Sequence, residues 1–264
     1  MPPITFDLLS VLFLSVLLMT SVFILLWLSY LGKPHRFYAV YDIVRSWCGI
    51  LAVLLVVFAL GQFALMLFAV CMGIQAVKEW HNVIKHPYQT VSSCTLEKYL
   101  IKPMTFVLIM AFSVSFMYLA YLLTMNNQLS VLLWLIFTAQ IDDVSQYLMG
   151  KSFGHKFFKG KLAPNISPNK TKEGFIFGVM LTSVLSVMVG QLLTPFSLLT
   201  CFALAWMICL LGVLGDLSES LFKRCHGVKD TAHWLKGHGG LLDRIDSLLF
   251  AVPIFTLVYV LCLS

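Results

Sequence analysis

The chain has 264 residues, of which 59% are hydrophobic and only 11% are charged, and its mean hydropathy is +0.90. Long apolar runs recur along the whole sequence, and no polar stretch is long enough for a separate extramembrane domain. A run of about 20 apolar residues crosses the hydrocarbon core as a helix. The composition therefore excludes a soluble globular protein and predicts an all-α integral membrane protein.

Eight apolar segments are predicted to cross the membrane, with seven or nine as the alternatives. They comprise residues 8–31, 46–60, 62–78, 104–124, 129–149, 174–192, 195–215 and 247–263. The count depends on residues 46–78, because a single helix of that length would extend about 50 Å against a core about 30 Å thick. Gly61 and Gln62 offer a break between two short spans.

The distribution of basic residues predicts the orientation. With the N-terminus outside, eight spans place all 18 lysine and arginine residues on one side, which the positive-inside rule identifies as the cytosol. Residues 1–45 are interpreted as a retained first span and a basic loop, and residues 46–264 complete a single polytopic domain. We expect a bacterial cytoplasmic membrane location with a cytosolic site. The net charge of +6 fits contact with anionic headgroups or nucleotides.

A basic loop between the fifth and sixth predicted spans has the composition of a phosphate-binding site. Residues 150–173 combine six lysines with glycines that give the backbone freedom. Just before this loop, Asp142 and Asp143 lie in an otherwise apolar segment. Carboxylates near the bilayer usually face a cavity, a partner or an ion. The alternative is that both lie at the aqueous end of their helix without a special role.

The polar segment 216–246 holds the highest concentration of candidate functional groups. If the preceding helix continues, an i, i+3, i+4, i+7 spacing places four side chains on one face: Asp216, Glu219, Ser220 and Lys223. Asp243 and Asp246 share a second face, and the glycine-rich run 237–240 between the two faces permits close approach of a ligand. Carboxylates beside cations are what Mg²⁺ and a triphosphate jointly require. A salt-bridged cytosolic hairpin is the alternative interpretation.

At these residues the chain resembles the CDP-diacylglycerol synthase family, the integral-membrane phosphatidate cytidylyltransferases. The family signature is matched at Ser220, Lys223-Arg224, Lys229-Asp230, Ala232, Leu235, His238-Gly239-Gly240, Asp243-Arg244 and Asp246. Further similarity lies upstream, at Asp143, at Gly150-Lys151, at Ser167-Pro-Asn-Lys-Thr-Lys-Glu-Gly174 and at the pair Glu79-Trp80. The chain departs from the family pattern at His233, at Lys236 and in the run Asp143–Tyr147.

The resemblance implies that CTP and phosphatidate react to give CDP-diacylglycerol and pyrophosphate. An oxygen of the lipid phosphate would attack the α-phosphorus of CTP, and a phosphate monoester is already charged near pH 7, so no strong general base is needed. The family likeness further implies Mg²⁺, with K⁺ as a candidate second cation. Membrane lipids and a second copy of the chain in a homodimer are the expected partners, and nucleic acid is not.

The resemblance also implies roles for individual residues. The implied metal ligands are Asp216 and Asp243, followed by Asp246 and Asp230. The implied catalytic groups are Asp216, Asp243, Asp246, Lys223, Arg224 and His238. Of these, His238 is expected to orient the glycine turn or a phosphate rather than to act as a base. The implied substrate contacts are Ser220, Lys229, Arg244, Lys170, Thr171, Gly239, Gly240 and Asp143.

Three other functions are alternatives to this one. A cytidylyltransferase for an isoprenoid ether-lipid phosphate would use the same residues. A CDP-alcohol phosphatidyltransferase is disfavoured, because its Asp-Gly-x-x-Ala-Arg motif is absent from the sequence. A non-catalytic homologue or transporter would use Asp142 and Asp143 as an ion site. The intact charged set in residues 216–246 argues against this last alternative.

Overall fold

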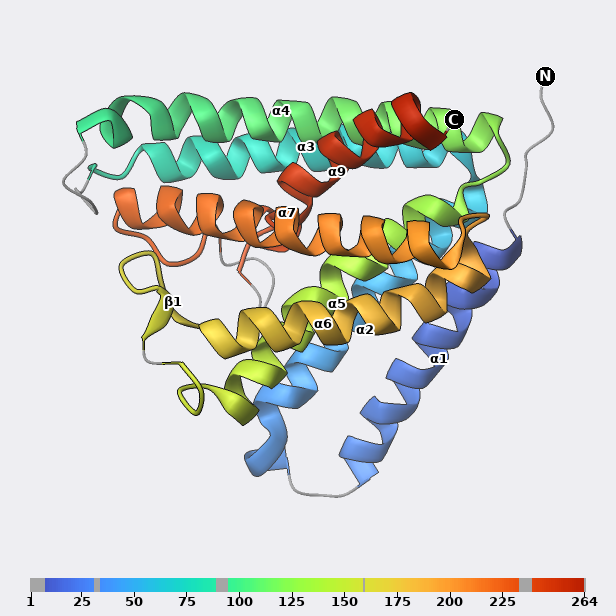
Figure 1. Cartoon of the computed structure of the whole chain (residues 1–264), viewed down its shortest axis with the longest axis horizontal. Helices are drawn as coiled ribbons and strands as arrows, with labels where there is room; N and C mark the ends of the chain where they lie inside the picture. The colour runs from blue at the N-terminus through green and yellow to red at the C-terminus, as the bar shows by residue number, and fades with distance from the viewer. Residues whose placement is uncertain (1–7, 31–33, 89–94, 159, 233–238, 264) are drawn as a thin grey trace.

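The computed structural model of the protein describes residues 8–30, 34–88, 95–158, 160–232 and 239–263. Over these ranges the chain is almost entirely helical, which confirms the predicted all-α class (Figure 1). In chain order the elements are α1 (Leu8–Tyr30), α2 (Pro34–Leu60), α3 (Gln62–Ile84), α4 (Thr95–Met125), α5 (Ser130–Phe153), β1 (Lys161–Ala163), β2 (Ser167–Thr171), α6 (Lys172–Leu193), α7 (Leu198–Cys225), α8 (Leu242–Ile245), α9 (Leu248–Val258) and a π-helical turn (Tyr259–Leu263).

Consecutive helices pack as antiparallel hairpins, which brings one set of helix ends together. α1 packs on α2, α3 on α4, and α6 on both α5 and α7. On the left of Figure 1 lie the C-terminal ends of α3, α5 and α7 together with the start of α6. The antiparallel β1–β2 hairpin, in which Lys161 pairs with Thr171, connects α5 to α6 at this end. The polar connections therefore gather at one end of the bundle.

The predicted break between the second and third apolar segments is confirmed. α2 ends at Leu60 and α3 begins at Gln62. Gly61 between them has φ 79° and ψ −157°, a conformation that residues with a Cβ atom rarely adopt. Glycine at this position lets the chain turn sharply, so the two apolar runs form two helices.

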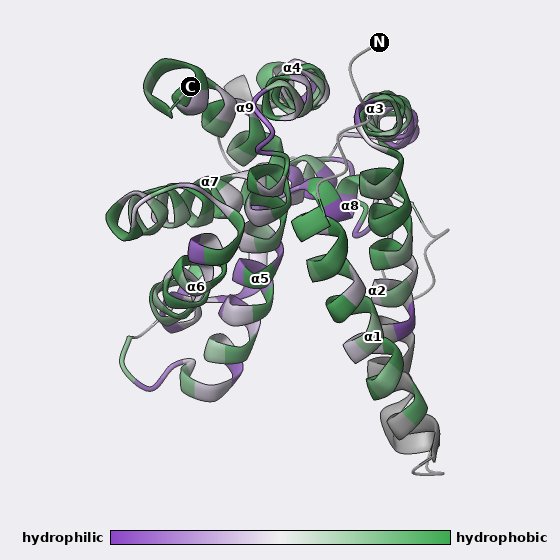
Figure 2. Ribbon diagram, turned by 90° about the vertical axis from the view of Figure 1, so that its right-hand side faces the viewer, coloured by the Kyte–Doolittle hydropathy of each residue, from purple (hydrophilic) through white to green (hydrophobic). Residues whose placement is uncertain are grey.

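Several helices suit a membrane by length and composition. Within the described ranges, the segments apolar enough and long enough to cross are Gln62–Ile84, Leu100–Met125, Lys172–Leu193 and Leu198–Cys225. Shorter apolar helices occur at Leu8–Ile24, Trp47–Leu60 and Leu248–Leu263. Hydrophobic residues make up most of the helices in Figure 2, and many large ones are exposed, with Phe63 at 85%. These features fit an integral membrane protein, while the number of spans and their orientation stay predictions.

The first half of α5 is buried inside the bundle, and the helix packs closely on α6. Trp134 of α5 is fully buried, and its indole Nε1 donates a hydrogen bond to the backbone oxygen of Ser186 on α6 (2.8 Å). Further along, a Cβ atom added at Gly178 of α6 would lie 2.6–2.8 Å from atoms of Gln146 on α5. In lipid, helices associate without a hydrophobic driving force, so small residues at which two backbones approach closely are favoured. This contact sets the position of the α5 end that carries Asp143.

We predict that Gly178→Ala lowers the thermal midpoint of the detergent-solubilised protein. The added methyl group must push α5 away from α6, at a typical cost of about 1–3 kcal/mol. Gly49→Ala is the matched control, because nothing lies within 4 Å of a Cβ atom at Gly49 in α2 and alanine favours a helix over glycine by about 1 kcal/mol. The control should leave the midpoint unchanged or raise it. Equal midpoints for the two variants would contradict the close α5–α6 contact.

Candidate active site

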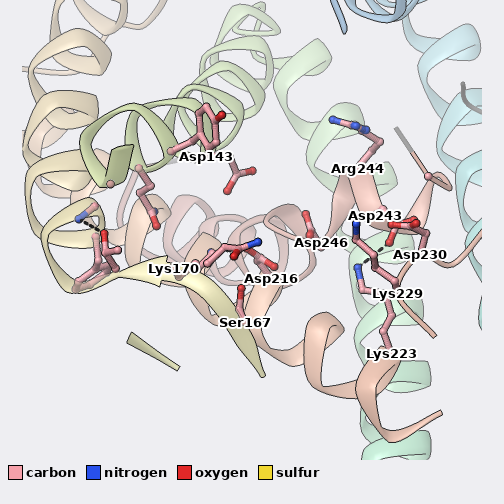
Figure 3. Close-up of a pocket in the computed structure, with 18 of the residues that line it drawn as sticks. Asp143, Ser167, Lys170, Asp216, Lys223, Lys229, Asp230, Asp243, Arg244 and Asp246 are labelled. Atoms are coloured by element: carbon pink, nitrogen blue, oxygen red, sulfur yellow. Dashed lines mark hydrogen bonds and ion pairs between the residues drawn. The ribbon is translucent and has the colours of Figure 1, made fainter. Parts of the chain in front are cut away.

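A polar cavity of about 970 Å³ lies where the helix ends meet (Figure 3). Its wall combines residues of α5, the β1–β2 hairpin, α7 and the chain around α8. Acidic and basic side chains line it in equal number: Asp143, Asp216, Asp230, Asp243, Asp246, Lys151, Lys170, Lys223, Lys229 and Arg244. The volume is typical of a small-molecule site. The structure thus brings together candidate residues from two distant parts of the sequence, while their chemical roles stay predictions.

Asp216 joins the upstream and downstream motifs. Its Oδ2 forms an ion pair with Nζ of Lys170 from β2, and its Oδ1 accepts a hydrogen bond from the Ser220 hydroxyl (3.0 Å). Burial acts to lower the pKa of Lys170, but the carboxylates of Asp216, Asp143 and Asp246 outweigh burial and raise that pKa above its usual value. Lys170 therefore remains charged and ties β2 to α7.

Lys223 is held between two carboxylates. Its Nζ lies 2.5 Å from Glu219 Oε2 on the same helix and 2.7 Å from Asp243 Oδ1 on α8. Glu219 and Lys223 share a helix face, as their spacing predicts. Lys223 is only 9% exposed, and a charge with little access to water needs such partners. The ion pair with Asp243 therefore fixes the short helix α8 against α7.

Asp243 uses both carboxylate oxygens within the chain. Besides the Lys223 contact at Oδ1, its Oδ2 accepts hydrogen bonds from the backbone N–H of Gly240 (2.7 Å) and from the N–H and hydroxyl of Thr231 (3.0 and 2.9 Å). Burial acts to raise the pKa of Asp243, but Lys223 and these donors lower it below its usual value. These donors occupy Oδ2, whereas Oδ1 keeps a second lone pair beside its Lys223 contact that a metal ion could use. The role of Asp243 as a metal ligand stays a prediction.

Asp246 lies among like charges. Its Oδ1 accepts a hydrogen bond from the backbone N–H of Ser247 (2.7 Å). Burial and the charges of Asp216 and Asp143 raise the pKa of Asp246 well above its usual value. Carboxylates that repel one another in a polar cavity are the hard oxygen donors that Mg²⁺ prefers. The donor chemistry therefore fits this ion, although in the described part of the chain no three Asp, Glu, His or Cys residues lie close enough to hold a metal as they stand.

The two described glycines of the predicted turn pack against carboxylates of the chain itself. Gly239 has φ 75°, and an added Cβ atom would lie 2.5 Å from Asp243 Oδ2. A Cβ atom at Gly240 would meet Oε2 of Glu79 and the hydroxyl of Thr231. Glycine at these positions thus permits internal packing, in addition to the ligand approach expected from the sequence.

Some predicted site residues lie outside the cavity, contact neighbouring backbone, or fall outside the described residues. Arg224 does not line the cavity; its guanidinium donates to the backbone oxygens of Ile166 (3.4 Å) and Val228 (3.5 Å). Thr171 lines the cavity, and its hydroxyl also caps α6 by accepting from the Gly174 N–H (3.0 Å). His238 lies outside the described residues, as do the two departures from the family pattern at His233 and Lys236.

Asp142 and Asp143, adjacent in sequence, have different surroundings. Asp143 lines the cavity, where Figure 3 shows it near Asp246. Asp142 is 2% exposed and accepts a hydrogen bond from the Gln146 side chain (2.6 Å). Successive residues of a helix point about 100° apart, which separates a cavity carboxylate from a core carboxylate.

Glu79 was not among the predicted site residues, although its carboxylate contacts the chain that carries Asp243. It accepts hydrogen bonds from the backbone N–H groups of Leu241 (2.9 Å) and Leu242 (2.8 Å). The sequence signal was an acidic residue near the end of an apolar segment, within the Glu79-Trp80 pair. That signal indicates a buried partner but does not say which one.

The chain belongs to the cytidylyltransferase family, because the model of this family matches residues 88–262. The match covers every residue that lines the cavity, from Asp143 to Asp246. The resemblance inferred from the sequence motifs is thereby confirmed.

Individual relatives agree with this family. The chain is 46% identical over 114 residues to the phosphatidate cytidylyltransferase of Bacillus subtilis, covering 42% of the chain and 40% of the relative. It is 41% identical over 141 residues to the Haemophilus influenzae phosphatidate cytidylyltransferase (50% and 46%) and 44% identical over 125 residues to the uncharacterized Escherichia coli protein YnbB (47% and 41%). The chain thus spans less than half the length of these relatives.

We predict opposite stability effects when the two aspartates of the α8 segment are neutralised. Without divalent cations at pH 7, Asp246→Asn removes repulsion from Asp216 and Asp143, whereas Asp243→Asn removes an acceptor from Lys223 or Gly240. About 1 kcal/mol shifts the thermal midpoint of a chain of this size by about 2–4 °C. The midpoint should rise by this amount for Asp246→Asn and fall at least as far for Asp243→Asn. A similar fall for both variants would contradict the charge assignment.

Proposed function

We propose that the protein transfers the cytidylyl group of CTP to the phosphate of phosphatidate, giving CDP-diacylglycerol and pyrophosphate. Family membership and two relatives named phosphatidate cytidylyltransferase support this reaction. The observation that carries the proposal is the cavity at the polar end of the bundle, where five cations and five aspartates face a space of about 970 Å³. We further propose that this end faces the cytosol of a bacterial inner membrane, where CTP is available.

The cavity cations are proposed to bind the two phosphate substrates. Lys170, Lys223, Lys229 and Arg244 come from β2, α7, the following loop and α8. Together they can neutralise the triphosphate of CTP and the lipid phosphate, which would otherwise repel each other. Lys170 and Lys223 are now paired with Asp216 and Asp243. Phosphate oxygens would replace those carboxylates as partners of the lysines and release them for a cation.

The bond changes in this reaction need little proton transfer. An oxygen of the lipid phosphate attacks the α-phosphorus of CTP, the bond from this phosphorus to the β-phosphate oxygen breaks, and pyrophosphate leaves with the electron pair. A phosphate monoester is largely a dianion at neutral pH. The residues of the cavity would therefore act by positioning the two phosphates and neutralising their charge, rather than as a general base.

Asp216 and Asp246 are the foremost proposed ligands for Mg²⁺, with Asp143 facing the same part of the cavity. Asp243, through its Oδ1, and Asp230 are further proposed ligands, since both line the cavity. Bound Mg²⁺ would supply charge neutralisation at the triphosphate. A K⁺ ion as second cation and a homodimeric assembly are further proposals from the family resemblance.

The acceptor lipid can differ within the same chemistry. An isoprenoid ether-lipid phosphate offers the same attacking oxygen, and the cavity residues would contact the phosphate rather than the lipid chains. Phosphatidate is the favoured acceptor because it is named in the relatives from B. subtilis and H. influenzae. Parallel assays with both lipid phosphates distinguish the two substrates.

We predict that purified protein in lipid nanodiscs converts CTP and phosphatidate to CDP-diacylglycerol in the presence of Mg²⁺. Lys170→Met should lower the rate by about 10²-fold, because it removes a charge from the site of the transferred phosphates. Lys85→Met is the control, since Lys85 is exposed and contacts the side chain of Asn82 at the end of α3. CDP-lipid and pyrophosphate are measured together. No CDP-lipid from either lipid phosphate would refute the proposed function.

A further inference from the structure

The side chain of Glu79 is a buried carboxylate that does not line the cavity. It lies on α3, near the end of that helix at Ile84, and is 2% exposed. Four donors surround it: the backbone N–H groups of Leu241 (2.9 Å) and Leu242 (2.8 Å), the hydroxyl of Thr231 (2.9 Å) and the amide of Gln75 (3.1 Å). Three of the four come from chain more than 150 residues away in the sequence.

These contacts hold a helix too short to be stable alone. α8 has only four residues, and an isolated helix needs roughly 12–15 residues to be even marginal in water. The first N–H groups of any helix lack partners within the helix. Glu79 binds the N–H groups of Leu241 and Leu242, and Asp243 binds that of Gly240. The start of α8 is therefore held by two carboxylates, one on α3 and one on α8 itself.

Thr231 connects the two carboxylates. Its hydroxyl oxygen lies 2.9 Å from Glu79 Oε2 and 2.9 Å from Asp243 Oδ2. A hydroxyl has one proton and donates to one acceptor at a time, so the positions of the two carboxylates depend on each other through Thr231. From Asp243 the contacts continue to Lys223 in the cavity wall.

The glycine at position 240 is required by this arrangement. An added Cβ atom would collide with Glu79 Oε2 and with the hydroxyl of Thr231. Only a residue without a side chain lets the backbone approach Glu79 closely enough for the N–H groups of Leu241 and Leu242 to reach it. The turn before α8 is thus shaped around the Glu79 carboxylate.

We infer that Glu79 is a positioning residue for the proposed active site. Its carboxylate fixes the turn from Gly240 to Leu242, and this turn directs Asp243 toward Lys223 and places Asp246 in the cavity wall. The consequence for activity rests on the proposed function, whereas the consequence for the structure of the turn does not. Glu79 acts through Asp243 and the backbone, without contact with the substrates.

Hydrogen–deuterium exchange of the full chain in detergent, without nucleotide or metal, tests the positioning role directly. In Glu79→Gln one of the two acceptor oxygens becomes an NH₂ group that faces a backbone N–H of the turn, so the amides of Gly240–Leu242 should exchange about tenfold faster. Amides of α5 and α6 should be unchanged. Lys78→Gln, an exposed neighbour on α3, is the matched control and should match the original chain. Unchanged exchange at the turn in Glu79→Gln would overturn the inference.

Thr231→Val provides a second variant in case Glu79→Gln fails to fold. It removes the hydroxyl between Glu79 and Asp243 and keeps nearly the same shape. It should also accelerate exchange at the turn, because Glu79 and Asp243 lose their common donor. Protection equal to that of the original chain in this variant would count against the inference.

The rate of CDP-lipid formation tests the consequence for catalysis. If the original chain is active, Glu79→Gln should lower kcat about 10- to 100-fold, and adding Thr231→Val should lower it little further, because both changes break one linked contact. Fully multiplicative losses, or an unchanged kcat, would refute positioning. An inactive original chain with faster turn exchange in Glu79→Gln would refute the proposed function alone and leave the structural inference standing.

Discussion

The site depends on the pairing of charges that have little access to water. Lys223 is 9% exposed and lies between Glu219 and Asp243, so one ammonium group joins α7 to the short helix α8. Removing Lys223 would leave both carboxylates without their shared cation, which is costly in a poorly hydrated interior. From Asp243 the hydrogen bonds continue through Thr231 to Glu79 on α3. Three segments of the chain are thereby held in one arrangement.

A second set of charges in the same cavity consists of carboxylates that repel one another. Asp246 lies near Asp216 and Asp143, and its pKa is raised by burial and by repulsion from these two carboxylates. Lys170 offsets part of the repulsion through its ion pair with Asp216. Asp243 is therefore stabilised by donors within the chain, whereas the other three carboxylates have negative charge that a bound cation can offset. Asp243 thus organises the site through its internal contacts, in addition to its proposed role toward Mg²⁺.

The close contact between α5 and α6 places one wall of the cavity. Gly178 allows α6 to approach Gln146, and the Trp134 indole ties α5 to the backbone of α6. The end of α5 can carry Asp142 and Asp143 because Asp142 has a hydrogen-bond donor and Asp143 faces the cavity, which reduces the cost of charge in an apolar bundle. The Gln146 side chain donates a hydrogen bond to Oδ2 of the buried Asp142, while Asp143 faces the cavity.

Much of this could be predicted from residue types and spacing. The apolar composition determined a helical membrane protein, Gly61 determined the break between α2 and α3, and the spacing from Asp216 to Lys223 determined a shared face, because each depends on local backbone geometry or on solvent preference. The motifs also identified the family.

The partners of each charge were decided only by the tertiary structure. Glu79 with Leu241, Lys170 with Asp216, and Arg224 with Ile166 join residues far apart in the sequence. The sequence shows that a charged residue in an apolar segment must be paired, because burial of an unpaired charge is costly. Helix packing decides which partner comes within reach.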